Sequence, residues 1–130
     1  MISLPIEVSA GLVLRDGLIL ITQRKMGTHL GGFWEFPGGK RNPDESWEGC
    51  LIRELEEELG ILVTVGDLRF EITHSYSSKS VHLRFYLCTL VRGEPQPIDC
   101  EAVLWVRPVD LPLYTFPEAD EALVRLLANG

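Results

Sequence analysis

The most informative segment of the chain is GKRNPDESWEGCLIRELEEELGI, residues 39–61. Its second half carries apolar side chains that fall on one side of a helical wheel drawn at about 100° per residue: Leu51, Ile52, Leu55 and Leu59. This apolar stripe predicts a helix over residues 46–59 that packs against a core. Gly60 follows as a suitable C-terminal cap.

Three carboxylates of the same helix, Glu54, Glu57 and Glu58, share an arc about 100° wide beside the apolar stripe. Like charges at this spacing repel one another, and the C-terminal end of a helix disfavours anions. A hard divalent cation would turn this repulsion into attraction, since carboxylate oxygens are ligands that magnesium and manganese prefer. Taken alone, a glutamate-rich helix of this kind is more often a solvated acidic face than a metal site.

The flanking sequence reads as a mixed sheet covered by helices on both faces. Two apolar runs, residues 6–14 and 18–23, flank Asp16-Gly17, which is a strong hairpin signal. Residues 25–32 form a polar, glycine-containing loop, and Pro37-Gly38-Gly39 is expected to interrupt regular structure. Further strands are predicted at 61–65, 67–76, 81–92 and 102–106, and a last helix at 117–128 that opens on Pro117.

Composition narrows the class of protein. The 130 residues suit a single domain, residues 1–130, and the net charge of −7 argues against a nucleic-acid polymer as partner. No apolar run is long enough for a membrane span, and residues 1–10 lack the basic start of a signal peptide. We expect a cytoplasmic monomer whose three cysteines are reduced, buried thiols: Cys50, Cys88 and Cys100.

The spacing within residues 39–61 resembles the Nudix box, the signature of the Nudix hydrolases. The matching positions are Gly39, Glu45, Arg53-Glu54-Leu55, Glu57-Glu58 and Gly60-Ile61. Residues 34–40, residues 116–120 and Trp105 are similar to the MutT-like branch of that family. The resemblance implies an α+β fold, a Nudix α/β/α sandwich with a mixed β-sheet between helices.

The resemblance also implies metal-dependent hydrolysis of a nucleoside triphosphate to a monophosphate and pyrophosphate. Glu54, Glu57 and Glu58 would hold Mg²⁺, for which Mn²⁺ is a possible substitute, with the main-chain oxygen of Gly38 as another ligand. One further acidic residue would assist, with Asp99 preferred to Glu101. The remaining positions of the box are expected to be structural: Gly39, Glu45, Arg53 and Gly60.

Candidate substrate-binding residues lie outside the acidic helix. Arg24 and Lys40 are candidates for phosphate binding, and His29 could approach the phosphates. The aromatic candidates for a base pocket are Tyr76, Phe36 and Phe116, with Ile6 as its floor. His74 and His82 are expected to be structural.

Asp120 occupies the position that would read the base, where the best-known bacterial 8-oxoguanine enzymes carry asparagine. An ionised carboxylate only accepts hydrogen bonds, whereas a protonated one in a partly buried pocket can also donate. The leading hypothesis is an 8-oxo-dGTP diphosphatase, and the alternative is a pyrophosphohydrolase for CTP or modified dCTP. A catalytically inactive nucleotide-sensing domain is the alternative from another class; the presence of all three glutamates argues against it.

Overall fold

The computed structural model describes residues 4–130, and its centre is a seven-stranded mixed sheet. The strands are β1 (Ile6–Arg15), β2 (Leu18–Gln23), β3 (Trp34–Glu35), β4 (Gly38–Lys40), β5 (Leu62–Ser75), β6 (Ser80–Arg92) and β7 (Ala102–Val106). They run in the order β3-β2-β1-β6-β5, while β4 pairs with β1 and β7 pairs with β2. The β1–β6 pair is parallel and the other pairs are antiparallel.

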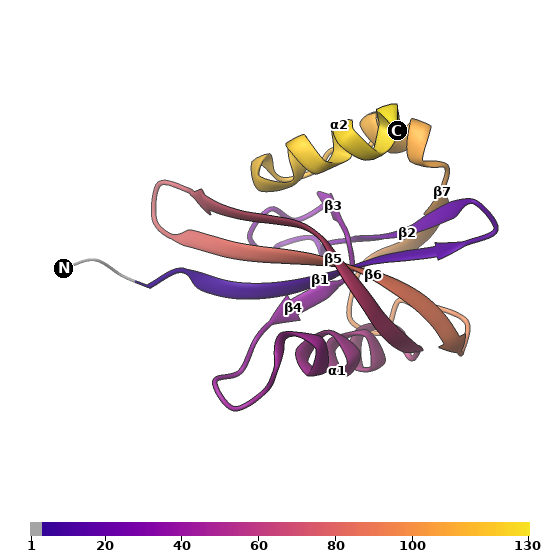
Figure 1. Ribbon diagram of the computed structural model, residues 1–130. Coiled ribbons are helices and arrows are strands. Elements are labelled where there is room, and N and C mark those ends of the chain that lie inside the picture. Colours follow the sequence, from indigo (N-terminus) through magenta and orange to yellow (C-terminus); the bar gives the residue numbers. More distant parts are fainter. Residues whose placement is uncertain (1–3) are drawn as a thin grey trace.

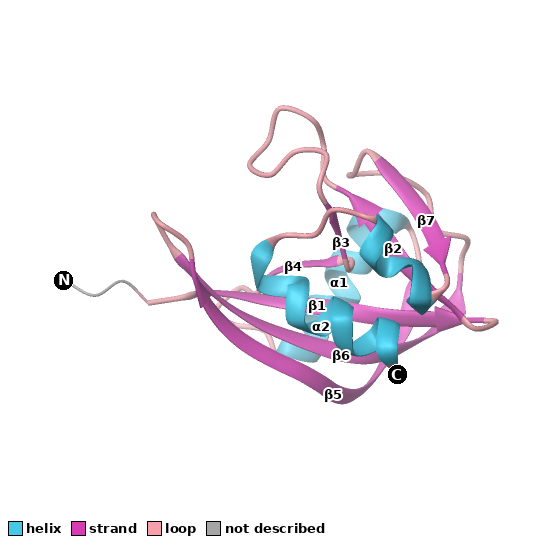
Figure 2. Ribbon diagram, turned by 90° about the horizontal axis from the view of Figure 1, so that it is seen from above, coloured by secondary structure: helices cyan, strands magenta, loops and turns pink. Residues whose placement is uncertain are grey.

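One long helix covers each face of the sheet: α1 (Trp47–Leu59) lies below it and α2 (Glu121–Asn129) above it (Figure 1). Seen from above, α2 lies over the long twisted strands (Figure 2). Successive strand residues point to opposite faces, so Leu12 joins the core under α2 while Val13 joins the core over α1. The predicted sandwich with a mixed sheet between helices is confirmed.

Helix α1 forms where its sequence predicts. Ser46 caps the first turn, because its hydroxyl accepts a hydrogen bond from the Gly49 N–H at 2.9 Å. At the other end Gly60 adopts a left-handed conformation, φ 70°, and its N–H bonds to the Glu56 carbonyl. Three residues of the apolar stripe are fully buried on the sheet, Leu51, Leu55 and Leu59, and the fourth, Ile52, is partly buried.

Two expectations about these elements were wrong, and one short element was not predicted. The two strands predicted at 61–65 and 67–76 are one strand, β5, because its pairing with β6 continues through bulges on either side of Leu68. The last helix begins at Glu121, not Pro117. Pro117 instead precedes a short 3₁₀ turn, Glu118–Asp120, in which the Asp120 N–H bonds to the Pro117 carbonyl. The sequence also gave no sign of the 3₁₀ helix Pro108–Leu113.

Pro37-Gly38-Gly39 was expected to break regular structure, yet β4 begins at Gly38 and pairs with β1. The approach is so close that a Cβ at Gly38 would collide with the Ser9 carbonyl.

All three cysteines are free and buried, as predicted, and burial raises the pKa of the Cys50 thiol to about 12. Within residues 4–130 no helix has the length and apolar character that a bilayer crossing requires.

Candidate functional site

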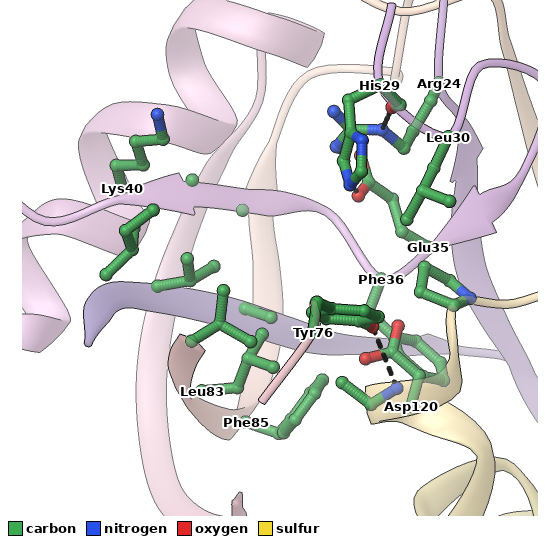
Figure 3. A pocket seen from close by; sticks show the side chains of 18 of the residues that line it. Arg24, His29, Leu30, Glu35, Phe36, Lys40, Tyr76, Leu83, Phe85 and Asp120 are labelled. Carbon is green, nitrogen blue, oxygen red and sulfur yellow. Dashed lines mark hydrogen bonds and ion pairs between the residues drawn. The ribbon is translucent and has the colours of Figure 1, made fainter. Parts of the chain in front are cut away.

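A cavity of about 200 Å³ opens beside β1 and β4 and gathers many of the predicted site residues (Figure 3). Its floor is apolar and comes from the sheet, with Ile6 and Leu83 among the lining side chains. Its polar groups come from separate elements: Arg24, His29, Glu35, Lys40 and Asp120. An apolar cavity with a few convergent polar groups is the usual form of a small-molecule site.

One end of the cavity is built around Asp120, whose side chain is buried with 5% exposure. Burial, and then the nearby Glu35 carboxylate, raises the pKa of Asp120 to about 7. Tyr76 also lines this end, and its hydroxyl accepts a hydrogen bond from the Ala119 N–H at 3.0 Å. Phe36 lines the cavity as well, so three of the residues predicted to face a base are brought together: Phe36, Tyr76 and Asp120.

The wall above this end is formed by the segment after β2. The Arg24 guanidinium donates through Nε to the His29 carbonyl at 2.8 Å and through Nη1 to Glu35 Oε1 at 3.1 Å. Two hydrogen bonds therefore fix the guanidinium at the cavity wall, as Figure 3 shows. Lys40 lies across the cavity on β4.

Sequence reasoning did not single out Glu35. It is partly buried on β3, lines the cavity and pairs with Arg24. Burial raises its pKa, and the Arg24 charge opposes that shift. The signal that could have found it is a lone carboxylate within the otherwise apolar run Trp34-Glu35-Phe36, because a charge in a buried strand requires a partner.

The acidic helix lies directly beside the cavity. The Glu54 carboxylate is in contact with Gly39, which lines the cavity, and leaves no room for a side chain at that position. Arg53 pairs with Glu54 at 3.0 Å and with Glu57 at 2.9 Å. Arg53 also forms an ion pair with Glu45, so two of the four residues expected to be structural contact each other.

Glu58 is the most electrostatically strained member of this helix. Burial, followed by the carboxylates Glu35, Glu54 and Asp99, raises the pKa of Glu58 to about 9. A cation among these groups would lower that cost, and their hard oxygen donors suit magnesium or manganese. The residues therefore fit a divalent metal by charge and by chemistry.

Within residues 4–130, no three His, Cys, Asp or Glu side chains already converge closely enough to hold a metal ion. The ion pairs with Arg53 account for this arrangement at Glu54 and Glu57, since each carboxylate turns toward the guanidinium. To bind a metal ion, Glu54 and Glu57 would have to give up some of their hydrogen bonds to Arg53 and turn oxygen atoms toward the cation.

The two candidates for the additional acidic residue lie on the segment between β6 and β7. The Asp99 carboxylate pairs with Lys25 Nζ at 2.6 Å, and the Asp99 N–H bonds to the Glu58 carbonyl at 3.2 Å. Glu101 accepts a hydrogen bond from the Met26 N–H at 3.4 Å. Of the two candidates, Asp99 is therefore the residue that bonds to the acidic helix. The sequence did not suggest Lys25 as its partner.

Phe116, the third aromatic candidate for a base pocket, does not line this cavity. It is buried behind Phe36, with ring centroids 5.2 Å apart, and faces the core rather than the cavity. The two remaining histidines do not line the cavity. His74 packs against Tyr76 with centroids 4.6 Å apart, and His82 bonds to Glu71 at 2.5 Å.

Known proteins are similar to this chain along most of its length. A family profile described as a NUDIX domain matches residues 9–126. The CTP pyrophosphohydrolase of Escherichia coli is 39% identical over 119 residues, covering 92% of this chain and 88% of that protein. The 8-oxo-dGTP diphosphatase of Haemophilus influenzae is 36% identical over 125 residues, covering 95% and 92%. The crystal structure of a MutT NUDIX hydrolase from Burkholderia pseudomallei superposes with a TM-score of 0.84 at 30% identity, covering 95% and 98%.

Proposed function

The chain belongs to the Nudix family of hydrolases, and on this basis we propose that it converts a nucleoside triphosphate to a monophosphate and pyrophosphate. Relatives of similar length are named for hydrolysis of 8-oxo-dGTP or CTP, both of which are nucleoside triphosphates. The cavity supports the assignment, because it combines a partly buried polar wall with an apolar floor and adjoins the acidic helix. Cleavage of an acid anhydride bond by water is the simplest chemistry for this set of groups.

Mg²⁺, or Mn²⁺ in its place, would supply charge neutralisation at the phosphates and make a bound water more acidic. We assign its ligands to Glu54, Glu57 and Glu58, with the Gly38 carbonyl as a further donor. Arg53 orients Glu54 and Glu57 and braces them through Glu45. The contact of Glu54 with Gly39 places this carboxylate at the edge of the cavity.

Arg24, His29 and Lys40 are assigned to the phosphates, because they supply donors at the cavity wall. Asp99 is assigned as the additional acidic residue, because its N–H bonds to the Glu58 carbonyl and its carboxylate adds to the negative field at Glu58. Its pair with Lys25 holds it at the segment that carries Arg24.

The observation that carries the choice of base is the buried carboxyl of Asp120, with a pKa of about 7. A protonated Asp120 donates from one oxygen and accepts at the other. The 8-oxoguanine base presents the O6 acceptor beside an N7–H donor, which matches this pair. Ordinary guanine has acceptors at both O6 and N7, so this edge of guanine does not match. We therefore propose 8-oxo-dGTP as the preferred substrate, with removal of oxidised nucleotides as the role.

Cytosine is the specific alternative. Its N3 acceptor lies beside the N4 amino donor, so a protonated Asp120 would fit it equally well. The Escherichia coli relative named for CTP is also 39% identical to this chain. Hydrogen bonding at Asp120 therefore disfavours the O6/N7 edge of guanine but does not separate 8-oxoguanine from cytosine, so turnover has to separate them.

The test is side-by-side turnover of 8-oxo-dGTP, dGTP, CTP and 5-methyl-dCTP with Mg²⁺, followed as pyrophosphate release. The expected result is a higher kcat/KM for 8-oxo-dGTP than for the other three. A higher kcat/KM for CTP or 5-methyl-dCTP would establish the cytosine alternative. Binding of nucleotides without turnover of any would favour an inactive sensing domain.

We further propose that the protein acts as a single domain and a cytoplasmic monomer on free nucleotides. The net charge of −7 disfavours a nucleic-acid polymer, while three buried thiols suit a reducing compartment. Gel filtration and a comparison of free 8-oxo-dGTP with DNA containing 8-oxoguanine would test both the monomer and the substrate form.

A further inference from the structure

Leu30 has a backbone conformation that leucine rarely adopts. Its φ is +56°, and Asp16, with φ +52° in the β1–β2 hairpin, is the only other non-glycine residue within 4–130 in the left-handed region. A bulky side chain there is sterically disfavoured, unlike the short polar side chain of aspartate. Such strain persists only where the surroundings fix it, and it concentrates at functional sites.

Hydrogen bonds on both sides of Leu30 fix its conformation. Its carbonyl accepts a bond from the Phe33 N–H at 3.1 Å, and the next residue, Gly31, donates to the Thr28 carbonyl at 2.9 Å. The carbonyl of the preceding residue, His29, accepts from Arg24 Nε at 2.8 Å. The left-handed turn is therefore part of the same network that holds the Arg24 guanidinium.

The same loop places glycine at two other left-handed positions, Gly27 with φ +83° and Gly32 with φ +85°. Glycine at position 30 would remove the steric conflict without altering the turn. A leucine that served only to form the loop would thus be the worse choice. Its side chain must contribute something that glycine cannot.

The Leu30 side chain lines the cavity next to Arg24 and Glu35 (Figure 3). Figure 3 shows Leu30, Arg24 and Glu35 together on one side of the cavity, above Asp120, with Lys40 on the opposite side. A nucleotide whose base faces Asp120 would therefore lie next to the Leu30 side chain.

We propose that Leu30 is a substrate-binding residue, held in a strained turn so that its side chain packs on the bound nucleotide and shields the Arg24–Glu35 ion pair from water. This inference rests on the proposed function. It assigns Leu30 a role in affinity, because apolar contact and exclusion of water both strengthen a bound complex. The chemical step itself depends on other groups.

Leu30→Gly is the main test, with Asp16→Gly as the matched control that relieves a left-handed residue far from the cavity. Both variants are expected to unfold at the same temperature as wild type or higher. For the nucleoside triphosphate that wild type turns over best, Leu30→Gly should raise KM about tenfold or more, with a smaller change in kcat. Asp16→Gly should leave both constants unchanged.

Leu30→Ala and Leu30→Met complete the set. Alanine removes the contact without adding glycine's flexibility, so it should also raise KM, whereas methionine keeps an apolar side chain and should restore most of the affinity. Calorimetry with the nucleoside monophosphate product should show the same order of affinities. Wild-type KM and wild-type product affinity in both Leu30→Gly and Leu30→Ala would overturn the proposal.

The wild-type protein separates this inference from the proposed function. If wild type hydrolyses no triphosphate but binds the monophosphate, the proposed function fails, and the calorimetry of the variants still decides the role of Leu30. If wild type neither hydrolyses nor binds nucleotides, both proposals fail.

Discussion

Arg53 and Glu45 form a two-pronged ion pair, in which Nε donates to Oε2 at 3.0 Å and Nη2 donates to Oε1 at 2.7 Å. The pair connects α1 to the loop that precedes it, and the Asn42 N–H adds a third hydrogen bond to Glu45 at 2.9 Å. The bonds from Arg53 are the main reason that the pKa of Glu45 falls to about 2. Arg53 therefore positions both the loop and the two outer glutamates of the acidic helix.

Arg53→Lys should lower kcat/KM by about tenfold or more, because an ammonium group cannot reproduce the planar fork that holds Glu45 while also contacting Glu54 and Glu57. The free energy of unfolding should also fall slightly, since the lysine ammonium cannot keep both hydrogen bonds to Glu45. The control is Arg107→Lys, which alters a similar two-pronged pair with Asp110 outside the cavity. Equal kinetics in the two variants would contradict the positioning role.

Glu57→Gln should reduce kcat by about 10²-fold or more, because it removes a metal ligand and its charge. Repulsion among the carboxylates alone would predict a more stable metal-free protein. Glu57 also accepts hydrogen bonds from Arg53, so we expect the melting temperature without metal to change little. Adding Mg²⁺ should raise the melting temperature of wild type more than that of this variant.

The matched control for Glu57→Gln is Glu56→Gln, an exposed glutamate of the same helix that points away from the cluster. It should keep wild-type kcat and a wild-type response to Mg²⁺. A loss of activity in Glu56→Gln as large as in Glu57→Gln would show that helix charge, rather than ligation, is responsible.

Asp120→Asn should remove a pH dependence of stability. The Asp120 carboxyl ionises near 3.8 when exposed but keeps its proton to about pH 7 in the folded protein, so the folded state binds more protons between these values. The free energy of unfolding therefore decreases, by up to about 4 kcal/mol, as pH rises from about 4 to about 7. Above pH 7 this contribution no longer changes. Asparagine stays neutral at every pH.

Urea unfolding of wild type and Asp120→Asn at pH 5 and pH 8 measures this difference. The stability of the variant relative to wild type should be greater at pH 8 than at pH 5. The same relative stability at both pH values would mean that Asp120 is not held protonated. A wild-type KM for 8-oxo-dGTP that rises above pH 7 would connect the titration to base binding.

Gly39→Ala should lower activity while leaving the fold intact. A Cβ at this position would collide with the Glu54 carboxylate, which is the flexible end of a side chain rather than backbone. Displacement of Glu54 should weaken Mg²⁺ binding, seen as a higher Mg²⁺ concentration for half-maximal rate. A wild-type Mg²⁺ dependence would show that Glu54 can move aside without cost to the metal site.

The sequence predicted α1, the main strands and the residues at both ends of the cavity, because those features depend on local patterns. The apolar stripe, Ser46 and Gly60 define α1 through contacts within a few residues. The features that were missed depend on distant partners. Residues 62–75 form one strand, β5, because their pairing with β6 continues through bulges. The residues around position 67 do not indicate locally that the strand continues.

The candidate site shows the same division. The sequence made Phe36 and Phe116 equal candidates for the pocket, because both are aromatic. Only packing against the rest of the core decides which of the two rings lines the cavity. Glu35 was missed because its two interactions are with distant residues. It accepts a hydrogen bond from Arg24, which follows β2, and its charge raises the pKa of Asp120, far along the chain. The left-handed conformation of Leu30 is likewise set by the loop around it, and leucine gives no sign of it.

The parallel pairing of β1 with β6 has a consequence for biosynthesis. Ile6 pairs with Val81, more than half the chain away, so during translation β1 is complete long before its central partner exists. Until β6 emerges from the ribosome, one long edge of an apolar strand remains open to other nascent chains. Productive folding in the cell then depends on the interval between synthesis of the two strands, and chaperone demand should be greatest during that interval.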